Sequence, residues 1–227
     1  MELLAPNGNP SNLTPEQYRL VRTSAFKKWF GDWENSPEKA SKVVDENGEP
    51  LVVYHASYKD FNAFDWEQLE YPQHDRGYYG KGFYFTNSLF NVKQYGSIIK
   101  SYFLDIKNPF YIPFEYQGSP RNFSNLFNDL KNFEKVDKEE YGDTRQSLLK
   151  GWHIDLDKDF QKKVTNRIKE WKYDGVDVIS ENEIVAFYPN QIKLADGTNT
   201  TFDGNDPDIR YSDGGNINDF TYEIGGL

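Results

Sequence analysis

Three apolar segments of this chain each carry one polar residue that buried strands seldom contain. Short runs rich in Val, Ile, Phe and Tyr are typical of strands. The segments are residues 51–57 (LVVYHAS), 82–86 (GFYFT) and 182–187 (NEIVAF), and the polar residues are His55, Tyr84 and Glu183. An imidazole, a phenol and a carboxylate from three strands can together grip a dinucleotide and stabilise a cation that forms on it. The pattern therefore indicates an enzyme.

Composition narrows the class of protein. The 227 residues include 16 Tyr, 17 Phe and 5 Trp, so we expect one domain with a core of aromatic rings. No apolar run has the length of a membrane span, and the N-terminus lacks a basic region followed by an apolar stretch. We therefore expect a cytoplasmic protein with no secretion signal and no membrane partner. The absence of Cys excludes disulfides and a cysteine nucleophile, and three His at unrelated spacings predict no metal site.

The charge balance bears on possible partners. A net charge of −10 argues against a protein that wraps duplex nucleic acid, because phosphate contacts supply most of that affinity. Lysines and arginines do gather between residues 158 and 172. The simplest interpretation of that cluster is a solvated helix face.

The chain divides into four stretches. Residues 1–12 are polar and rich in Pro and Gly, typical of a linker. Residues 13–40 predict a helical segment that docks on a larger body: Thr14 and Gln17 match a capping box, the pattern breaks near Thr23, and Gly31 ends it. Residues 41–202 form the main domain, and residues 203–227 a polar tail. The two ends resemble linker, so we expect a module excised from a longer polyprotein.

Within the main domain, strands and helices alternate irregularly, which predicts the α+β class. A hairpin is expected over residues 43–55 through Asn47-Gly48, and another over 183–187 and 191–195. Further strands are expected at 83–86, 102–106 and 176–179. Helices are expected at 88–96 and 157–171, with another at 124–133 inside an insert spanning 111–150.

The ordered set of residues carries a family resemblance. His55 in Tyr-His-Ala-Ser, Tyr84 in Gly-Phe-Tyr-Phe-Thr and Glu183 in Asn-Glu-Ile-Val-Ala-Phe resemble the His-Tyr-Glu signature of the diphtheria-toxin and poly(ADP-ribose)-polymerase branch of ADP-ribosyltransferases. Tyr95 is similar to that family's second ring-stacking tyrosine. A longer pattern over residues 12–212, with LVRT, FKKWFGDW and FYPNQIK, resembles ADP-ribosyltransferase modules in polyvalent proteins of bacteriophages and mobile elements.

The resemblance implies a split β-sheet that binds NAD, as co-substrate, in the cleft between two sheets. His55 would hydrogen-bond the adenosine ribose, and Tyr84 and Tyr95 would sandwich the nicotinamide. Glu183 would bind the 2′-hydroxyl of the nicotinamide ribose and orient the acceptor. The loop over residues 65–80 would cover the adenine.

Lesser roles are implied for the neighbours of these residues. The backbone of Ala56 would hold the carboxamide, and Ser57 would support the site. Gly82, with Gly80, would let the backbone approach the dinucleotide. The family commonly has glycine at the place of Ala56 and, in the polymerases, a serine at the place of Val92, so both positions depart from its pattern.

The chemistry fits these residue types. Cleavage of the nicotinamide–ribose bond builds positive charge on the sugar, as in glycoside cleavage. A carboxylate about 4 Å away stabilises that charge by roughly 4 kcal/mol at an effective dielectric near 20. Glu181 and Glu183 form a Glu-x-Glu pair, which would place a substrate-orienting carboxylate on the same strand face; a solvated Glu181 is the alternative interpretation.

The sequence thus predicts a mono-ADP-ribosyltransferase that acts on a macromolecule, with a protein side chain favoured as acceptor. A single-stranded nucleic-acid base is the main enzymatic alternative, and NAD hydrolysis is another. A catalytically silent binding module, or one carried inside a virion, is the alternative from a different class. An inhibitor or immunity partner is not identifiable from the sequence.

Overall fold

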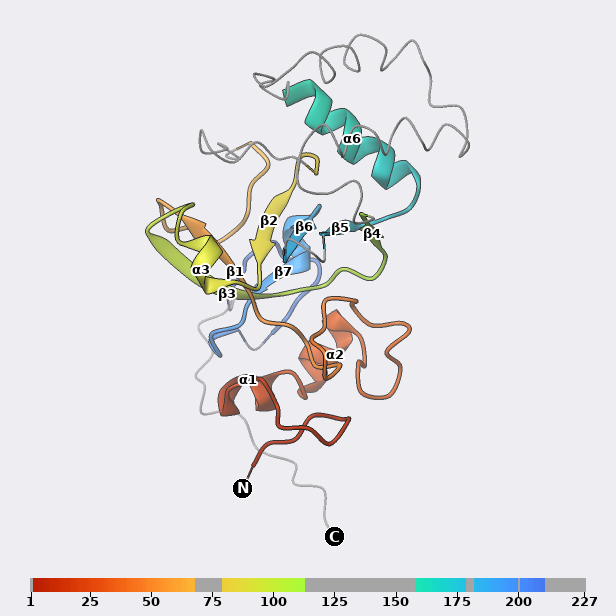
Figure 1. Ribbon diagram of the computed structural model, residues 1–227, viewed down its shortest axis with the longest axis vertical. Coiled ribbons are helices and arrows are strands. Elements are labelled where there is room, and N and C mark those ends of the chain that lie inside the picture. Colours follow the sequence, from red (N-terminus) through yellow and green to blue (C-terminus); the bar gives the residue numbers. More distant parts are fainter. Residues whose placement is uncertain (1, 68–78, 113–157, 179–181, 200, 211–227) are drawn as a thin grey trace.

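The computed structural model describes residues 2–67, 79–112, 158–178, 182–199 and 201–210. In these ranges seven strands form one mixed sheet in the order β4-β5-β6-β2-β1-β3-β7. The strands are β1 Val53–Ser57, β2 Phe83–Thr86, β3 Ile98–Leu104, β4 Pro109–Tyr111, β5 Gly175–Val178, β6 Glu183–Ala186 and β7 Ile192–Leu194. The helices are α1 Pro15–Leu20, α2 Ser24–Phe30, α3 Leu89–Val92, α6 Lys158–Glu170 and the 3-10 turn η4 Pro189–Gln191. Figure 1 shows the sheet between α6 at one end of the molecule and α1 and α2 at the other.

All neighbouring strands are antiparallel except β4 and β5. The arrangement is of the α+β class. The expected division into two separate sheets is not confirmed, because strand pairing joins all seven strands into one sheet. β1 and β2 meet at a single position, Tyr54 opposite Thr86, whereas β1 pairs with β3 along all five of its residues. The sheet therefore opens at the junction of β1 and β2 without separating.

Alternation along the strands gives the sheet two differently covered faces. One face, called here the central face, carries Phe83, Phe85, Tyr102 and Ile184 in a large apolar cluster. The other, called here the helical face, is covered in two places. α6 packs through Val164 and Ile168 against side chains of β2, β5 and β6, and α2 packs against Phe103 of β3. The opening of β1 and β2 lies between these two covered regions of the sheet.

The N-terminal helical segment begins and ends at capping residues. Thr14 and Gln17 form a reciprocal capping box at α1, Thr23 caps α2, and Gly31 ends it with a φ of 101°. Three rings of α2 lie in an aromatic cluster with Phe103 and Phe202; they belong to Phe26, Trp29 and Phe30. The segment therefore packs on β3 and shares its core.

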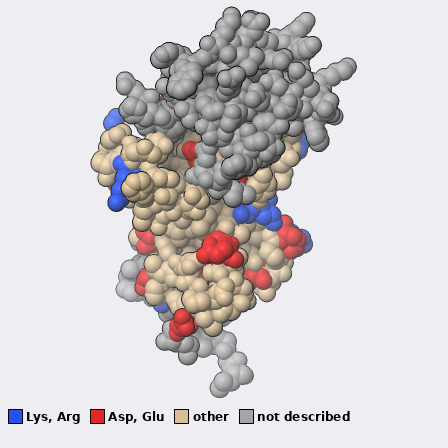
Figure 2. Space-filling model, in the orientation of Figure 1, with Lys and Arg blue, Asp and Glu red and all other residues tan. Residues whose placement is uncertain are grey.

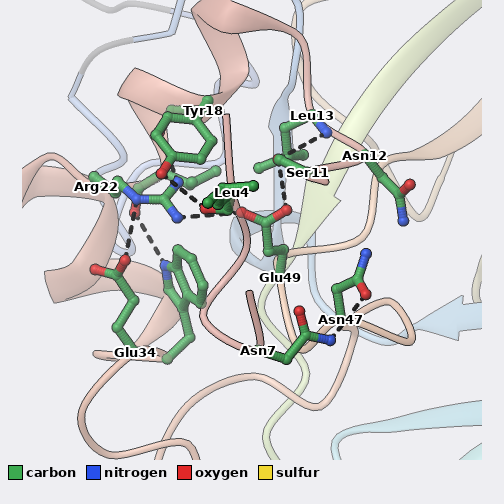
Figure 3. Close-up of polar contacts among 12 residues, drawn as sticks. Leu4, Asn7, Ser11, Asn12, Leu13, Tyr18, Arg22, Glu34, Asn47 and Glu49 are labelled. Atoms are coloured by element: carbon green, nitrogen blue, oxygen red, sulfur yellow. Dashed lines mark hydrogen bonds and ion pairs between the residues drawn. The ribbon is translucent and has the colours of Figure 1, made fainter. Parts of the chain in front are cut away.

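A buried carboxylate ties the first residues of the chain to this body. Glu49 is fully buried; its two oxygens meet the Arg22 guanidinium at 3.2 Å and the Ser11 hydroxyl at 2.6 Å. Arg22 also lies 3.0 Å from Glu34 and stacks on Tyr18. Figure 3 shows these partners around the Glu49 carboxylate. Residues expected to be linker thus contribute to a packed polar cluster.

The expected hairpin between residues 183–187 and 191–195 is wrong. β6 pairs with β2 and β5, and β7 pairs with β3 at the edge of the sheet. The cause is the buried side chain of Gln191. Its Oε1 accepts from the amides of Phe187 and Tyr188 at 3.0 and 2.8 Å. Its Nε2 donates to the carbonyls of Asp105 and Asp174 at 3.0 and 2.9 Å, which directs the chain away from β6.

Other elements differ from expectation in their limits. The expected hairpin at 43–55 has one bridge, Val44 to Pro50, closed by Gly48 at a φ of 79°. β3 begins at Ile98 rather than residue 102, because Ile98 to Tyr102 pair with β1. β4 was not expected; it begins at Pro109, which suits an edge strand because proline has no amide to donate. The insert helix expected at 124–133 lies outside the described residues.

Residues 203–210, expected to start a tail, lie against β7. The buried Lys193 ammonium donates to the carbonyls of Asp206 and Asp208 at 2.5 and 2.6 Å. The Leu194 amide donates to the carbonyl of Ile209, whose side chain is fully buried. The boundary after residue 202 remains a prediction, but these eight residues contact the core.

We predict that Gln191→Leu lowers the free energy of unfolding by about 3 kcal/mol or more. Four backbone groups around this buried side chain would lose their hydrogen-bond partner, and each buried group left without one costs about 1–3 kcal/mol. Denaturant unfolding measures the change. Asn190→Ala is the control, because its exposed amide makes one hydrogen bond, to Gly204. Equal stability of the two variants would contradict the role given to Gln191.

Candidate active site

His55 occupies the place where β1 and β2 part. Continued pairing beyond Tyr54 and Thr86 would put Ala56 opposite Tyr84. Instead, Nδ1 of His55 lies 2.8 Å from the Tyr84 carbonyl oxygen. A carbonyl can only accept, so Nδ1 carries the hydrogen and donates it. The imidazole therefore substitutes for a ladder hydrogen bond at the opening of the sheet.

Aromatic rings surround this imidazole on the central face. Phe64 and Phe85 have ring centroids 5.1 and 5.5 Å from that of His55, with Phe61 and Tyr102 slightly farther. Burial among these rings lowers the pKa of His55, although its bond to the Tyr84 carbonyl favours the charged form. The imidazole is therefore neutral at physiological pH. With Nδ1 protonated, Nε2 is left as a hydrogen-bond acceptor.

Tyr84 uses its hydroxyl to fix the chain that precedes β2. The hydroxyl donates to the Gly80 carbonyl at 2.6 Å and accepts from the Tyr79 amide at 3.1 Å. Its ring belongs to the cluster beneath α6 and is 9% exposed. The hydroxyl therefore fixes the turn before β2, and the ring packs between the sheet and α6 on the helical face.

Glu183 is the first residue of β6 and lies opposite Thr86 of β2. Paired residues share a face, so Glu183, Thr86 and Tyr84 all belong to the helical face. The preceding Asn182 has a φ of 53°, a left-handed conformation that asparagine tolerates better than most residues. This turn delivers the Glu183 carboxylate, which is partly exposed, to the beginning of its strand.

The structure brings two of the three main side chains to one face. Tyr84 and Glu183 lie on neighbouring strands, two positions apart in register, on the helical face. The His55 ring lies with Phe85 on the central face. The Tyr84 residue connects the two faces: its side chain lies on the helical face, and its backbone carbonyl accepts the hydrogen bond from His55. The sequence suggested one pocket formed by all three side chains, whereas the structure places them on the two faces of the sheet, on either side of the opening.

The smaller residues of the predicted site have close structural neighbours. Ala56 is buried opposite Ile99, and the Ser57 hydroxyl donates to the Lys59 carbonyl at 2.8 Å. A Cβ at Gly82 would come within 2.2 Å of a Val185 methyl. Packing against β6 therefore explains the glycine without a ligand. Contacts of Ala56, Ser57 and Gly82 with nicotinamide or NAD remain predictions.

Tyr95 lies in a turn, where a helix was expected. α3 ends at Val92, whose side chain is buried, and the Tyr95 amide donates to the Val92 carbonyl. The helix is short because Gly96 packs directly on Ser57: a Cβ there would lie 2.5 Å from its backbone. The chain then enters β3 at once. Tyr95 is partly exposed and follows an element that contacts both β1 and β2.

Glu181 and most of the 65–80 loop, both part of the predicted site, lie outside the described residues. In the described ranges no three His, Asp or Glu side chains gather as a metal site requires. None of the described helices has the length and apolar character to cross a bilayer.

Sequence reasoning missed two residues that shape the site. Thr86 is buried, faces Glu183 and accepts the Ser88 amide through its hydroxyl at 3.1 Å. Asn182 supplies the positive φ before Glu183. The Asn before an apolar run was a visible sign of a left-handed turn, whereas the partner of Thr86 depends on strand register.

We predict that Asn182→Gly leaves stability within about 1 kcal/mol of the wild type, whereas Asn182→Val destabilises the protein by about 1–2 kcal/mol or more. A β-branched residue is strained in the left-handed conformation, and glycine is not. Thermal unfolding of both variants tests this. Equal melting temperatures for Gly and Val would show that the turn does not control entry into β6.

The lowered pKa of His55 predicts a pH dependence. Below about pH 6.5 the unfolded chain takes up a proton that the folded chain resists, so this residue makes stability fall as the solution is acidified and has no such effect above that pH. In His55→Asn, an amide nitrogen can replace Nδ1 as donor without titrating. The stability difference between the two proteins, measured by denaturant unfolding from pH 8 to pH 5, should shift in favour of the variant on acidification. A constant difference would contradict a buried neutral imidazole.

Comparison with known proteins identifies the family. A family model described as ADP-ribosyltransferase in polyvalent proteins matches residues 45–202, more than half of the chain, beginning in the turn before β1 and including β7. No curated protein and no solved structure matches it significantly. The matched range contains His55, Tyr84, Tyr95 and Glu183 together with every strand of the sheet. The chain therefore belongs to the ADP-ribosyltransferases found in polyvalent proteins.

Proposed function

We propose that this protein transfers a single ADP-ribose from NAD to a side chain of a host protein and releases nicotinamide. ADP-ribosyl transfer from NAD to an acceptor follows from the family. The single transfer, the protein acceptor and the residues in each role are the proposal. The observation that carries it is the carboxylate of Glu183, held at the start of β6 beside the opening of β1 and β2.

Glu183 is assigned the catalytic carboxylate. It would bind the 2′-hydroxyl of the nicotinamide ribose and face the positive charge that develops as the glycosidic bond breaks. At about 4 Å and an effective dielectric near 20, that charge is stabilised by roughly 4 kcal/mol, or about three powers of ten in rate. Its position at the first residue of β6, on the same face as Tyr84, supports this role.

His55 is assigned the adenosine ribose. A neutral ring with Nδ1 bonded to the Tyr84 carbonyl offers only the lone pair of Nε2. A ribose hydroxyl would donate to that lone pair. The same bond couples ribose binding to the strand that bears Tyr84, so the two halves of the dinucleotide site share one backbone segment.

Tyr84 and Tyr95 are assigned the nicotinamide ring, with the backbone of Ala56 holding its carboxamide. Aromatic faces suit both a flat ring and a cation. The fixed hydroxyl of Tyr84 supports a rigid wall, and Tyr95 follows α3, which contacts both β1 and β2, so its ring can reach the opening. Glu181 would orient the acceptor.

A protein acceptor is favoured by charge. The chain has a net charge of −10, and the described acidic and basic side chains on the face in Figure 2 are interspersed rather than gathered in one basic stripe. Extended phosphate contacts need such a stripe. We infer an effector encoded by a bacteriophage or mobile element that acts in the host cytoplasm.

The acceptor can be identified with labelled NAD and a bacterial lysate. Label that protease removes and nuclease leaves supports the proposal. Label on nucleic acid would move the acceptor to a base, and nicotinamide release without transfer would make the protein a hydrolase. No turnover under any condition would leave a silent binding module.

We predict that Glu183→Gln binds NAD with an affinity close to that of the wild type and loses about three powers of ten in nicotinamide release. The amide keeps the shape of the side chain and removes its charge. Calorimetry and a nicotinamide assay measure the two quantities. Glu38→Gln, at an exposed position outside the site, is the matched control. Unchanged turnover in Glu183→Gln would remove the carboxylate from the mechanism.

A further inference from the structure

Two lysines far apart in the sequence share one tryptophan ring. The ammonium of Lys81, just before β2, lies 5.2 Å from the centroid of the Trp66 ring. The ammonium of Lys169, near the end of α6, lies 5.0 Å from the same centroid. The two nitrogens cannot be farther apart than these two distances together. One indole thus contacts two positive charges.

Lys169 is held by more than this indole. Its ammonium lies 4.3 Å from the ring centroid of Tyr188 and 5.3 Å from that of Phe187. Aromatic faces attract a cation, most strongly when water is partly excluded. Burial lowers the pKa of Lys169. The three rings therefore fix the direction of an ammonium that remains partly desolvated.

Neither lysine has a carboxylate at ion-pair distance within the described residues. Other partly buried basic residues do: Lys27 contacts Glu34 at 2.5 Å, and Arg167 contacts Glu170 at 3.0 Å. The contrast is pronounced in a chain with 36 acidic residues. Two cations on one ring, with no acidic partner among the described residues, repel each other and are stabilised by an anion that binds beside them.

The lysine pair lies on the segment that leads into the candidate site. Lys81 follows Gly80, the residue whose carbonyl accepts the Tyr84 hydroxyl. The Lys81 carbonyl accepts the Thr165 hydroxyl at 2.9 Å, which fixes this segment to α6. Trp66 packs on Phe83 with ring centroids 5.1 Å apart. The cations are therefore attached to rigid elements that also hold Tyr84.

We propose that Lys81 and Lys169, seated on Trp66, form a phosphate-binding subsite at the β2 entrance of the candidate site. Lysine is a common phosphate ligand because it is a compact point charge with three donors. The inference rests on the proposed function and deepens it. The phosphate comes either from the diphosphate of NAD or from the backbone of a nucleic acid, and the second source would replace the protein acceptor proposed above; the two sources are separable by experiment.

The test compares Lys81→Gln, Lys169→Gln and the double variant with the wild type. Lys162→Gln is the matched control, because Lys162 is exposed on the same helix. Thermal unfolding first establishes that each variant is folded. Calorimetry then measures the Kd for ADP-ribose and for nicotinamide riboside, and a single-stranded oligonucleotide is titrated at several salt concentrations.

If the subsite holds the diphosphate of NAD, each substitution weakens ADP-ribose about tenfold, as expected for the loss of one charged contact. Nicotinamide riboside, which has no phosphate, is unaffected. If the phosphate belongs to a nucleic acid, ADP-ribose binding is unchanged and the oligonucleotide loses affinity and salt dependence. Either result supports the subsite and identifies its source.

Wild-type affinity of the double variant for both phosphate probes would overturn the inference, as would a wild-type protein that binds neither. The rings would then serve only to pack the two lysine side chains. Failure of the proposed function would give a different result: the wild-type protein would bind ADP-ribose but release no nicotinamide from NAD. That result leaves the comparison of the lysine variants intact.

Discussion

The hydrogen bond from the His55 ring to the Tyr84 carbonyl is the contact on which the arrangement of the site depends. Two adjacent strands of a sheet ordinarily saturate each other's backbone groups. Here a side chain takes over one carbonyl, and the strands diverge beyond a single pair of residues. The donor must be neutral at physiological pH to leave Nε2 as an acceptor, and the surrounding Phe64 and Phe85 rings favour that state. One hydrogen bond thus accompanies the opening of the sheet and leaves the Nε2 lone pair as an acceptor.

Rigid attachments on both sides keep this opening in place. α6 and α2 cover separate parts of the helical face, so neither β2 nor β3 can turn freely. Gln191 then connects the ends of three segments: the turn after β6, the residue after β3 and the residue before β5. Because one side-chain amide bonds the backbone of all three segments, it fixes the position of β3 relative to β5 and β6, which lie on the other side of the opening.

Local patterns in the sequence predicted the elements whose causes are local. The helix α6, the capping residue Thr14, the break near Thr23 and the strand at Phe83–Thr86 lie close to where they were expected. The predicted pairing of β6 with β7 was wrong, because strand pairing here depends on hydrogen bonds from Gln191 to residues far away in the sequence. The types of the site residues were also visible in the sequence. The face on which His55 lies was not, since alternation assigns faces only after the sheet's opening is known.

The buried Glu49 sets the minimum length of chain that can fold. The family match begins at residue 45 and stops at 202, yet Glu49 has its counter-charge at Arg22 and a hydroxyl donor at Ser11. A fragment trimmed to the match would retain the carboxylate and discard both partners. The fragment would also lose the rings of α2 that pack on Phe103 of β3, so apolar surface would be exposed beside the unpaired carboxylate. The autonomous unit therefore extends beyond the homologous region, and expression of the matched range alone would yield an unstable polypeptide.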